Sequence, residues 1–136
     1  AWHVQSRSTN NQWLLEIEPE NFLLMKPSDA SKNALQTGDK VRVVSASYPE
    51  GVLARVRVTP TLPPGTTQLY FHFGRQWFGS VPIYIDGSAT EFDKAVGTGT
   101  PANPVMLGDP DFPELPFTDQ LSGQAVYVGR ITVAKI

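Results

Sequence analysis

The sequence predicts a mainly β domain, a small β-barrel with one or two short helices. Twelve prolines and 11 glycines are spread over the 136 residues, which is the close punctuation of a β-rich chain. Several runs alternate apolar and polar residues with the period of a half-buried strand. The length suits a single domain covering residues 1–136, and 40% hydrophobic residues are enough for a core.

The first expected elements are a strand and a helix. "NFLLM" at 21–25 is a short apolar run and predicts a buried strand. "KPSDASKNAL" at 26–35 predicts a short helix, because Pro27 suits the first helical position, where no N–H is needed. Lys26 is then the N-cap, a position at which Asn, Asp, Ser or Thr is preferred.

A hairpin and two further strands are expected after the turn at 37–39. "KVRVVSAS" (40–47) and "VLARVRVT" (52–59) both alternate, and "YPEG" between them is a tight turn, so they predict a β-hairpin. "TTQLYFHF" (66–73) and "AVYVGRITVAKI" (125–136) predict one strand each. Between 74 and 117 regular patterning fails, and we expect a functional loop region or short helical turns there.

Charge and composition exclude several functional classes. A net charge of −2 and a pI near 5.6 give no electrostatic reason to expect nucleic acid or an anionic membrane as a partner. Without cysteine, the chain forms no disulfide, cysteine-ligated zinc site or iron–sulfur cluster. No apolar run has the length of a membrane-spanning helix, and no signal peptide is visible. A start at Ala1, without Met, leads us to expect a piece of a longer protein.

Side-chain catalysis has little support in the sequence. The carboxylates show no spacing that specifies an acid and base pair, and no G-x-S-x-G motif is present. "GTGTPAN" is rich in glycine but lacks the lysine of a phosphate-binding P-loop. His72 in "YFHFG" has two interpretations, a packed histidine or part of a site. We therefore expect no activity from this chain alone.

Three polar clusters, at 3–13, 70–79 and 97–104, predict a binding site. Each combines amides or hydroxyls with an aromatic residue or a glycine. Amides donate and accept together, and glycine permits close backbone approach, so such clusters suit a flat, hydrogen-bonding ligand with phosphates. Trp2 and Trp13 bracket the first cluster and predict an ordered loop that the aromatic rings pin to a surface.

The order of motifs resembles one known family. "HVQSRSTNNQWLLEIEPEN", "MKPSDASKNALQTGDKVRVVS", "ARVRVTPTLPPGTTQLYFHFG" and "GTGTPANPVMLGD" together resemble the C-terminal molybdopterin-dinucleotide-binding domain of the dimethyl-sulfoxide-reductase family of molybdenum and tungsten oxidoreductases. The similarity covers almost the whole chain. It is greatest to the polysulfide, thiosulfate and tetrathionate reductase branch of anaerobic respiration, with arsenate-type enzymes nearby.

The resemblance implies a six-stranded, double-psi-like β-barrel and a particular role. The domain would be a non-catalytic lid over the bis(molybdopterin guanine dinucleotide) cofactor, with molybdenum or tungsten, shared with domains outside this chain. No metal ligand would come from these residues. Expected partners are those other domains and an iron–sulfur electron-transfer subunit. The expected location is the periplasm or the outer face of the cytoplasmic membrane.

Cofactor-binding residues follow from the matching positions. They are expected in three groups: a first contact loop with His3, Ser6, Arg7, Ser8, Asn10 and Asn11; the pair His72 and Phe73; and Asn103. The family usually has Asn or His where this chain has Lys26, so we assign no cofactor role to Lys26. Asp29 is expected to serve helix capping or the helix dipole.

Three alternatives stay open at this point. The chain could be a cofactor-free double-psi barrel that recognises a protein or peptide, although such a module needs an apolar groove rather than amide-rich loops. It could also be a separate small subunit that supplies this domain in trans. Finally, Asn103 could merely cap its own turn, since asparagine commonly does so.

Overall fold

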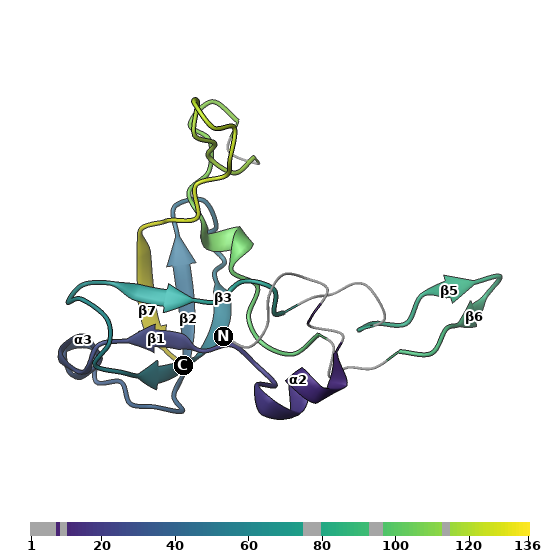
Figure 1. The fold of residues 1–136 in the computed structure, drawn as a ribbon, viewed down its shortest axis with the longest axis horizontal. Helices are drawn as coiled ribbons and strands as arrows, with labels where there is room; N and C mark the ends of the chain where they lie inside the picture. The colour runs from purple at the N-terminus through teal and green to yellow at the C-terminus, as the bar shows by residue number, and fades with distance from the viewer. Residues whose placement is uncertain (1–7, 9–10, 75–79, 93–96, 113–114) are drawn as a thin grey trace.

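The computed structural model describes residues 8, 11–74, 80–92, 97–112 and 115–136. Its centre is a curled five-stranded sheet in the order β4-β1-β3-β2-β7 (Figure 1). The strands of this sheet are β1 (Leu23–Met25), β2 (Lys40–Ser45), β3 (Val52–Val58), β4 (Thr67–Leu69) and β7 (Ile131–Lys135). β1 and β3 are parallel, and the other neighbours are antiparallel.

The hairpin expected at 40–59 is confirmed. β2 and β3 pair antiparallel, with Val41 opposite Ala54 and Val43 opposite Val52. Val41 and Val43 are at most 1% exposed, whereas Leu53 on the other parity of β3 is 60% exposed. One face of the hairpin therefore lies in the core and the other faces solvent, as the alternation predicts.

The helix α3 (Pro27–Lys32) also confirms the prediction, including its weak start. Lys26 is the N-cap and makes no side-chain capping bond. The Asp29 carboxylate lies in the first turn, where it favours the helix dipole. It does not cap the helix, however, because it accepts a hydrogen bond of 2.6 Å from the Gly65 N–H in the loop before β4.

One hydrophobic core lies against the sheet. It is built mainly from aliphatic side chains of the five strands, of α3 and the turn after it, and of η2 (Asn103–Val105). Its buried members are Leu23, Met25, Ala30, Leu35, Val41, Val43, Val52, Ala54, Val56 and Val105, with Ile131 and Val133 of β7 partly buried against them.

The structure confirms a mainly β fold with short helices, but it does not confirm the predicted barrel. β1 lies between β3 and β4, so the chain crosses over β1 to connect these two consecutive strands. The described sheet has five strands and two edges, and a closed six-stranded double-psi barrel is not confirmed. The strands expected at 66–73 and 125–136 are shorter than predicted. The Tyr70 carbonyl bonds to a side chain, and Val126 and Val128 pair with Phe117 and Leu107 instead of extending the sheet.

Two segments project from the sheet (Figure 1). One is a hairpin of β5 (Tyr84–Ile85) and β6 (Ser88–Ala89) around Asp86 and Gly87, whose φ values are 49° and 78°. The other spans 107–127 and contains isolated bridges such as Gly108 to Pro116. The sequence analysis missed the hairpin, although Asp-Gly is the preferred pair for a turn with two positive φ angles.

A short helix follows the polar opening of the chain. α2 (Gln12–Ile17) begins directly after Asn11, where a loop was expected. Trp13 is 77% exposed, so the expectation that this ring pins the opening to a surface is wrong. Trp2 lies outside the described residues. Among the helices that the structure describes, none is long and apolar enough to cross a membrane.

Candidate functional site

Asn21 joins segments that are far apart in the sequence. Its side chain is 1% exposed. The Nδ2 group donates to the carbonyls of Tyr70 and Thr100, at 2.6 and 2.9 Å, and Oδ1 accepts from the Thr100 N–H at 2.7 Å. These partners are 49 and 79 residues away. The clusters predicted at 70–79 and 97–104 therefore meet at one buried amide beside the segment that follows α2.

Further hydrogen bonds tie the loop at 97–101 to its surroundings. Thr98 Oγ1 donates to the Pro19 carbonyl, and the Thr98 carbonyl accepts from the Gly74 N–H at 2.8 Å. Thr100 Oγ1 donates to the Leu53 carbonyl of β3 at 2.7 Å. Glu20 adds an ion pair to β3, with its Oε1 3.2 Å from Arg55 Nε. Residues 19–21, 72–74 and 97–101, which we call the loop cluster, thus form one bonded unit on β3.

Two glycines allow the close packing of the loop cluster. Gly99 has φ 89°, and a Cβ at this position would lie 2.6 Å from Asn21 Oδ1 and 2.8 Å from Phe73 Cβ. Gly74 has φ 71°, and a Cβ there would lie 2.3 Å from the Pro101 nitrogen. A larger residue is excluded at both positions for two reasons. The positive φ is unfavourable for a residue with a side chain, and neighbouring atoms occupy the place of the Cβ.

His72 and Phe73, both predicted for the site, lie in the loop cluster. His72 has φ 84°, a left-handed conformation that costs a non-glycine residue about 1–3 kcal/mol and often occurs at functional sites. Its ring lies 6.1 Å from that of Phe71, which packs edge-on against Tyr127 at 4.8 Å. Phe73 is only 4% exposed, so its side chain packs beneath the loop. Contact of either residue with a cofactor stays a prediction.

Asn103 lies beyond the loop cluster, at a separate cleft. It is exposed and begins the short helix η2. The cleft has a volume of about 470 Å³ and is lined by Asn103, Ser47, Tyr48 and Met106 among others. The N-cap of η2 is Ala102, without a side-chain bond, so Asn103 does not cap its own turn. Among the residues that the structure describes, none forms a hydrogen bond with the Asn103 amide.

The first contact loop is described only in part. Ser8 is half-buried, and its carbonyl accepts from the Asn11 N–H at 3.1 Å. Asn11 is the N-cap of α2, where its Oδ1 accepts from the Trp13 N–H at 3.0 Å. His3, Ser6, Arg7 and Asn10, predicted for the same loop, lie outside the described residues. A cofactor contact by Ser8 or Asn11 therefore stays a prediction as well.

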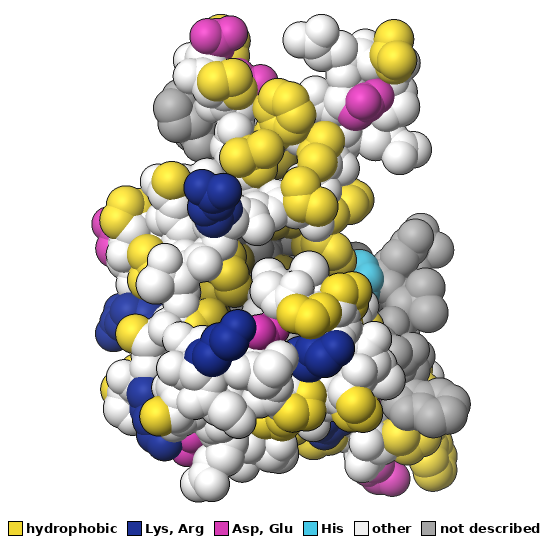
Figure 2. All heavy atoms as spheres, turned by 90° about the vertical axis from the view of Figure 1, so that its left-hand side faces the viewer, with side chains coloured by type: hydrophobic (Ala, Val, Ile, Leu, Met, Phe, Trp, Pro, Cys, Tyr) yellow, Lys and Arg dark blue, Asp and Glu magenta, His cyan; other side chains and the backbone are white. Residues whose placement is uncertain are grey.

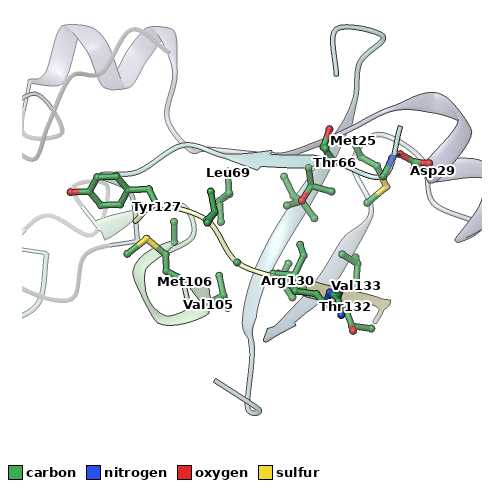
Figure 3. Close-up of a pocket in the computed structure, with 18 of the residues that line it drawn as sticks. Met25, Asp29, Thr66, Leu69, Val105, Met106, Tyr127, Arg130, Thr132 and Val133 are labelled. Atoms are coloured by element: carbon green, nitrogen blue, oxygen red, sulfur yellow. Dashed lines mark hydrogen bonds between the residues drawn. The ribbon is translucent and has the colours of Figure 1, made fainter. Parts of the chain in front are cut away.

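A larger cleft of about 760 Å³ opens between the two edges of the sheet (Figure 3). Thr66 and Leu69 line one side, and Arg130 and Thr132 lie across from them. Tyr127 and Met106 lie at one end of the cleft and Asp29 at the other. This cleft has mixed apolar and polar walls, and none of the predicted site residues that the structure describes lines it.

Charged side chains are scattered over the face of the molecule that carries α3. On this face, Figure 2 shows Lys and Arg side chains that stand apart rather than forming one basic patch, while hydrophobic side chains gather toward the projecting segment. No group of three or more His, Cys, Asp or Glu residues suited to a metal ion occurs in the described part of the chain.

Asn21 is the main residue that the sequence analysis missed as part of the site. It ends the "EPEN" stretch, which contributes to the resemblance, and it begins the strand predicted at 21–25. A polar residue directly before an apolar strand usually indicates a turn. One feature of the sequence could have indicated its burial. Asn21 stands directly before the apolar run "FLLM", so its side chain lies next to a buried strand.

Comparison with known proteins identifies the family to which the chain is similar. The family model described as the molydopterin dinucleotide binding domain matches residues 1–113. A selenate reductase chain of Mesobacillus selenatarsenatis is 29% identical over 98% of this chain and 14% of its own length. The molybdopterin-containing ArrA chain of the arsenate respiratory reductase of Chrysiogenes arsenatis is 27% identical over 97% of this chain and 15% of its own.

A third relative is more similar over a shorter region. A tetrathionate reductase chain of Archaeoglobus fulgidus is 34% identical over 62% of this chain and 8% of its own length. The chain thus spans between 8% and 15% of the curated relatives it matches.

Proposed function

We propose, from the premise that the chain belongs to the molydopterin dinucleotide binding domain family of dimethyl-sulfoxide-reductase-like oxidoreductases, that it binds a molybdopterin guanine dinucleotide. It would do so as the lid domain of a larger catalytic subunit. The family match over residues 1–113 carries this proposal. The cofactor supplies the redox chemistry when bound, and the residues of this chain only hold and orient it.

The donor set fits one part of such a cofactor. Pterin and guanine present alternating donors and acceptors at the ring edge, and an asparagine amide matches both. The Asn103 amide is exposed beside a cleft of about 470 Å³ and is not used for capping. His72, in the loop cluster, is a further polar residue predicted to contact the cofactor. We assign the ring-edge contact to Asn103.

The activity of the whole enzyme is a further part of the proposal. We infer that it reduces an oxyanion or a related compound of sulfur, selenium or arsenic, with tetrathionate, thiosulfate and polysulfide as the first candidates. The names of the matched selenate, tetrathionate and arsenate reductases support this class. The same resemblance is the basis for expecting an iron–sulfur partner subunit, an exported location, a sixth strand, and either molybdenum or tungsten as the metal.

The test of cofactor binding is Asn103→Leu in the full-length catalytic subunit. If Asn103 pairs with the ring edge in a water-poor site, its loss leaves ligand atoms unpaired, at about 1–3 kcal/mol. We expect pterin content, measured by fluorescence after oxidation, to fall about tenfold. Thermal melting should barely change, because the amide has no described partner. Gln68→Leu, which removes an exposed amide from β4, is the matched control and should leave pterin content unchanged.

Two outcomes would contradict this assignment. A full-length wild-type protein without pterin or metal would overturn the proposed function itself. An Asn103→Leu variant that melts much earlier but keeps a full cofactor load in its folded fraction would give Asn103 a structural role only. The substrate class is tested separately, by comparing reduction of tetrathionate, thiosulfate, polysulfide, selenate and arsenate with one artificial electron donor.

A further inference from the structure

We propose that Asn21 is a positioning residue that holds the two cofactor-facing loops in register without touching the cofactor. This inference rests on the proposed function. It starts from the burial of the side chain: at 1% exposure, Asn21 offers no surface to a ligand. Both N–H donors of its amide are used, for Tyr70 and Thr100, and Oδ1 accepts from Thr100. A role in the site must therefore be exerted through these partners.

The partners lie directly beside the residues assigned to the cofactor. Tyr70 precedes His72 by two positions, and Thr100 precedes Asn103 by three. A change at Asn21 therefore moves the start of both loops at once. A displacement of about 1 Å is enough to weaken a well-oriented contact strongly, even when it arises away from the ligand.

The conformation of His72 depends on the same hydrogen bonds. A non-glycine residue at φ 84° persists only where the surroundings enforce it. On one side of His72, Asn21 holds the Tyr70 carbonyl at 2.6 Å. On the other side, the Gly74 N–H bonds to the Thr98 carbonyl at 2.8 Å. His72 is thus fixed between two bonds, and one of them comes from Asn21.

The chemistry of the position selects asparagine. Aspartate keeps the shape and the acceptor for the Thr100 N–H, but its second oxygen would face the carbonyls of Tyr70 and Thr100 without a proton to donate. Leucine removes all three bonds. Asn21→Asp is therefore the sharpest variant, because it changes hydrogen bonding with little change in volume.

Two readouts, both taken on the full-length catalytic protein, test the proposal. Hydrogen exchange reports the amides of Gly74 and Thr100, and pterin and metal content per folded protein report the cofactor. In Asn21→Asp we expect exchange at both amides to accelerate about tenfold, with the amides of β2 and β3 unchanged. Cofactor content should fall about tenfold. The control is Asn33→Asp, in which an exposed amide that donates to the Asp29 carbonyl is lost, and neither readout should change.

Each remaining outcome has a defined meaning. Faster exchange with a full cofactor load would overturn the proposal and leave Asn21 as a structural residue. A wild-type protein without pterin would instead overturn the proposed function, whatever the exchange data show. If Asn21→Asp does not fold, Thr98→Val takes its place, because it removes the hydroxyl that bonds to the Pro19 carbonyl beside Asn21. A loss of cofactor of about threefold then supports the proposal, and an unchanged load overturns it.

Discussion

The five-stranded sheet and the loop cluster are held together in different ways. In the sheet, Val41, Val43 and Val56 are at most 1% exposed and pack in one hydrophobic core. In the loop cluster, the specific contacts are hydrogen bonds from Asn21 and Thr98 to backbone groups, and close packing at glycine. The sheet is therefore stabilised mainly by burial of apolar surface, and the loop cluster by a few directional bonds.

This difference has a consequence for substitutions. A change in the core of the sheet alters the free energy of unfolding of the whole domain. A change in the loop cluster acts on a few bonds and alters local geometry first, which is what a cofactor senses. Substitutions in the two regions can test whether the sheet determines stability and the loop cluster determines local geometry.

The largest effect is expected from Leu23→Ala in β1. Leu23 is 1% exposed and lies in the centre of the core, so its truncation loses transfer free energy and leaves a cavity. We expect the free energy of unfolding to fall by about 4 kcal/mol. Urea denaturation followed by circular dichroism measures this change. Leu53→Ala on β3, at 60% exposure, is the control and should change stability by less than about 0.5 kcal/mol. Equal losses for both variants would contradict the burial argument.

The next effect is expected from Gly99→Ala in the loop cluster. The new Cβ would meet Asn21 Oδ1 at 2.6 Å while the backbone keeps a positive φ. Gly38→Ala is the matched control, because Gly38 has φ 97° but nothing within 4 Å of the Cβ position. Both variants suffer from the positive φ, and only Gly99→Ala also crowds its neighbours. We expect Gly99→Ala to destabilise the chain by about 2 kcal/mol more than the control in thermal melts. Equal melting temperatures would show that the loop cluster moves aside freely.

The same division explains what could be predicted from the sequence. The β2–β3 hairpin and α3 were predicted because their signals are local: alternation around "YPEG" for the hairpin, and Pro27 for the helix. In the two strands of the hairpin, the alternation of residues also predicted which side chains face the core, and Val41, Val43 and Val56 are indeed buried. By contrast, the ends of β4 and β7 were predicted too long. Alternation continues in the sequence after Leu69, but the Tyr70 carbonyl is taken by Asn21, 49 residues away.

The candidate site was less predictable for the same reason. The described parts of the polar clusters predicted at 70–79 and 97–104 do lie together, because Tyr70 and Thr100 both bond to Asn21. That they form a cofactor site stays a prediction. The residue that joins them, Asn21, has partners up to 79 residues away, and nothing local marks such a bond. Asn11 has a local role that was not predicted, while its contact with a cofactor stays a prediction. Its amide caps α2, a local role that the dense polar run obscured.

A smaller effect is expected where the two regions meet. Thr100 Oγ1 donates to the Leu53 carbonyl, so the loop cluster is bonded to β3 at this point. Thr100→Val keeps the shape, removes the donor and leaves that carbonyl without this partner. We expect a loss of about 1 kcal/mol in urea denaturation. Thr61→Val, which removes an exposed hydroxyl that bonds to the nearby Thr59, should change stability far less. A similar loss in both variants would remove Thr100 as a link between the regions.

The smallest effects concern two carboxylates, one on the sheet and one on the projecting segment. Asp39 joins the start of β2 to β7: the hydrogen bond from Lys135 Nζ at 2.7 Å is the main cause that lowers the pKa of Asp39, and the Gln36 N–H adds to it. Asp119 lies in the projecting segment, and the backbone N–H and hydroxyl of Ser122 lower the pKa of its carboxyl. Both groups have an ordinary pKa of 3.8.

The sign of the pH dependence follows from these lowered values. A carboxyl whose folded pKa lies below its unfolded pKa stabilises the fold above the unfolded value, and this stabilisation is lost as pH falls through the folded pKa. The destabilisation in Asp39→Asn should therefore be present at neutral pH, begin to shrink near pH 3.8 and vanish only below the lowered pKa of the folded state. Salt separates the two sites. Because the partner of Asp39 is charged and that of Asp119 is neutral, added salt should raise the pKa of Asp39 toward its ordinary value and leave that of Asp119 unchanged. Carboxyl NMR titration at low and high salt measures both shifts, and an equal salt response at the two sites would show that the Lys135 charge does not set the pKa of Asp39.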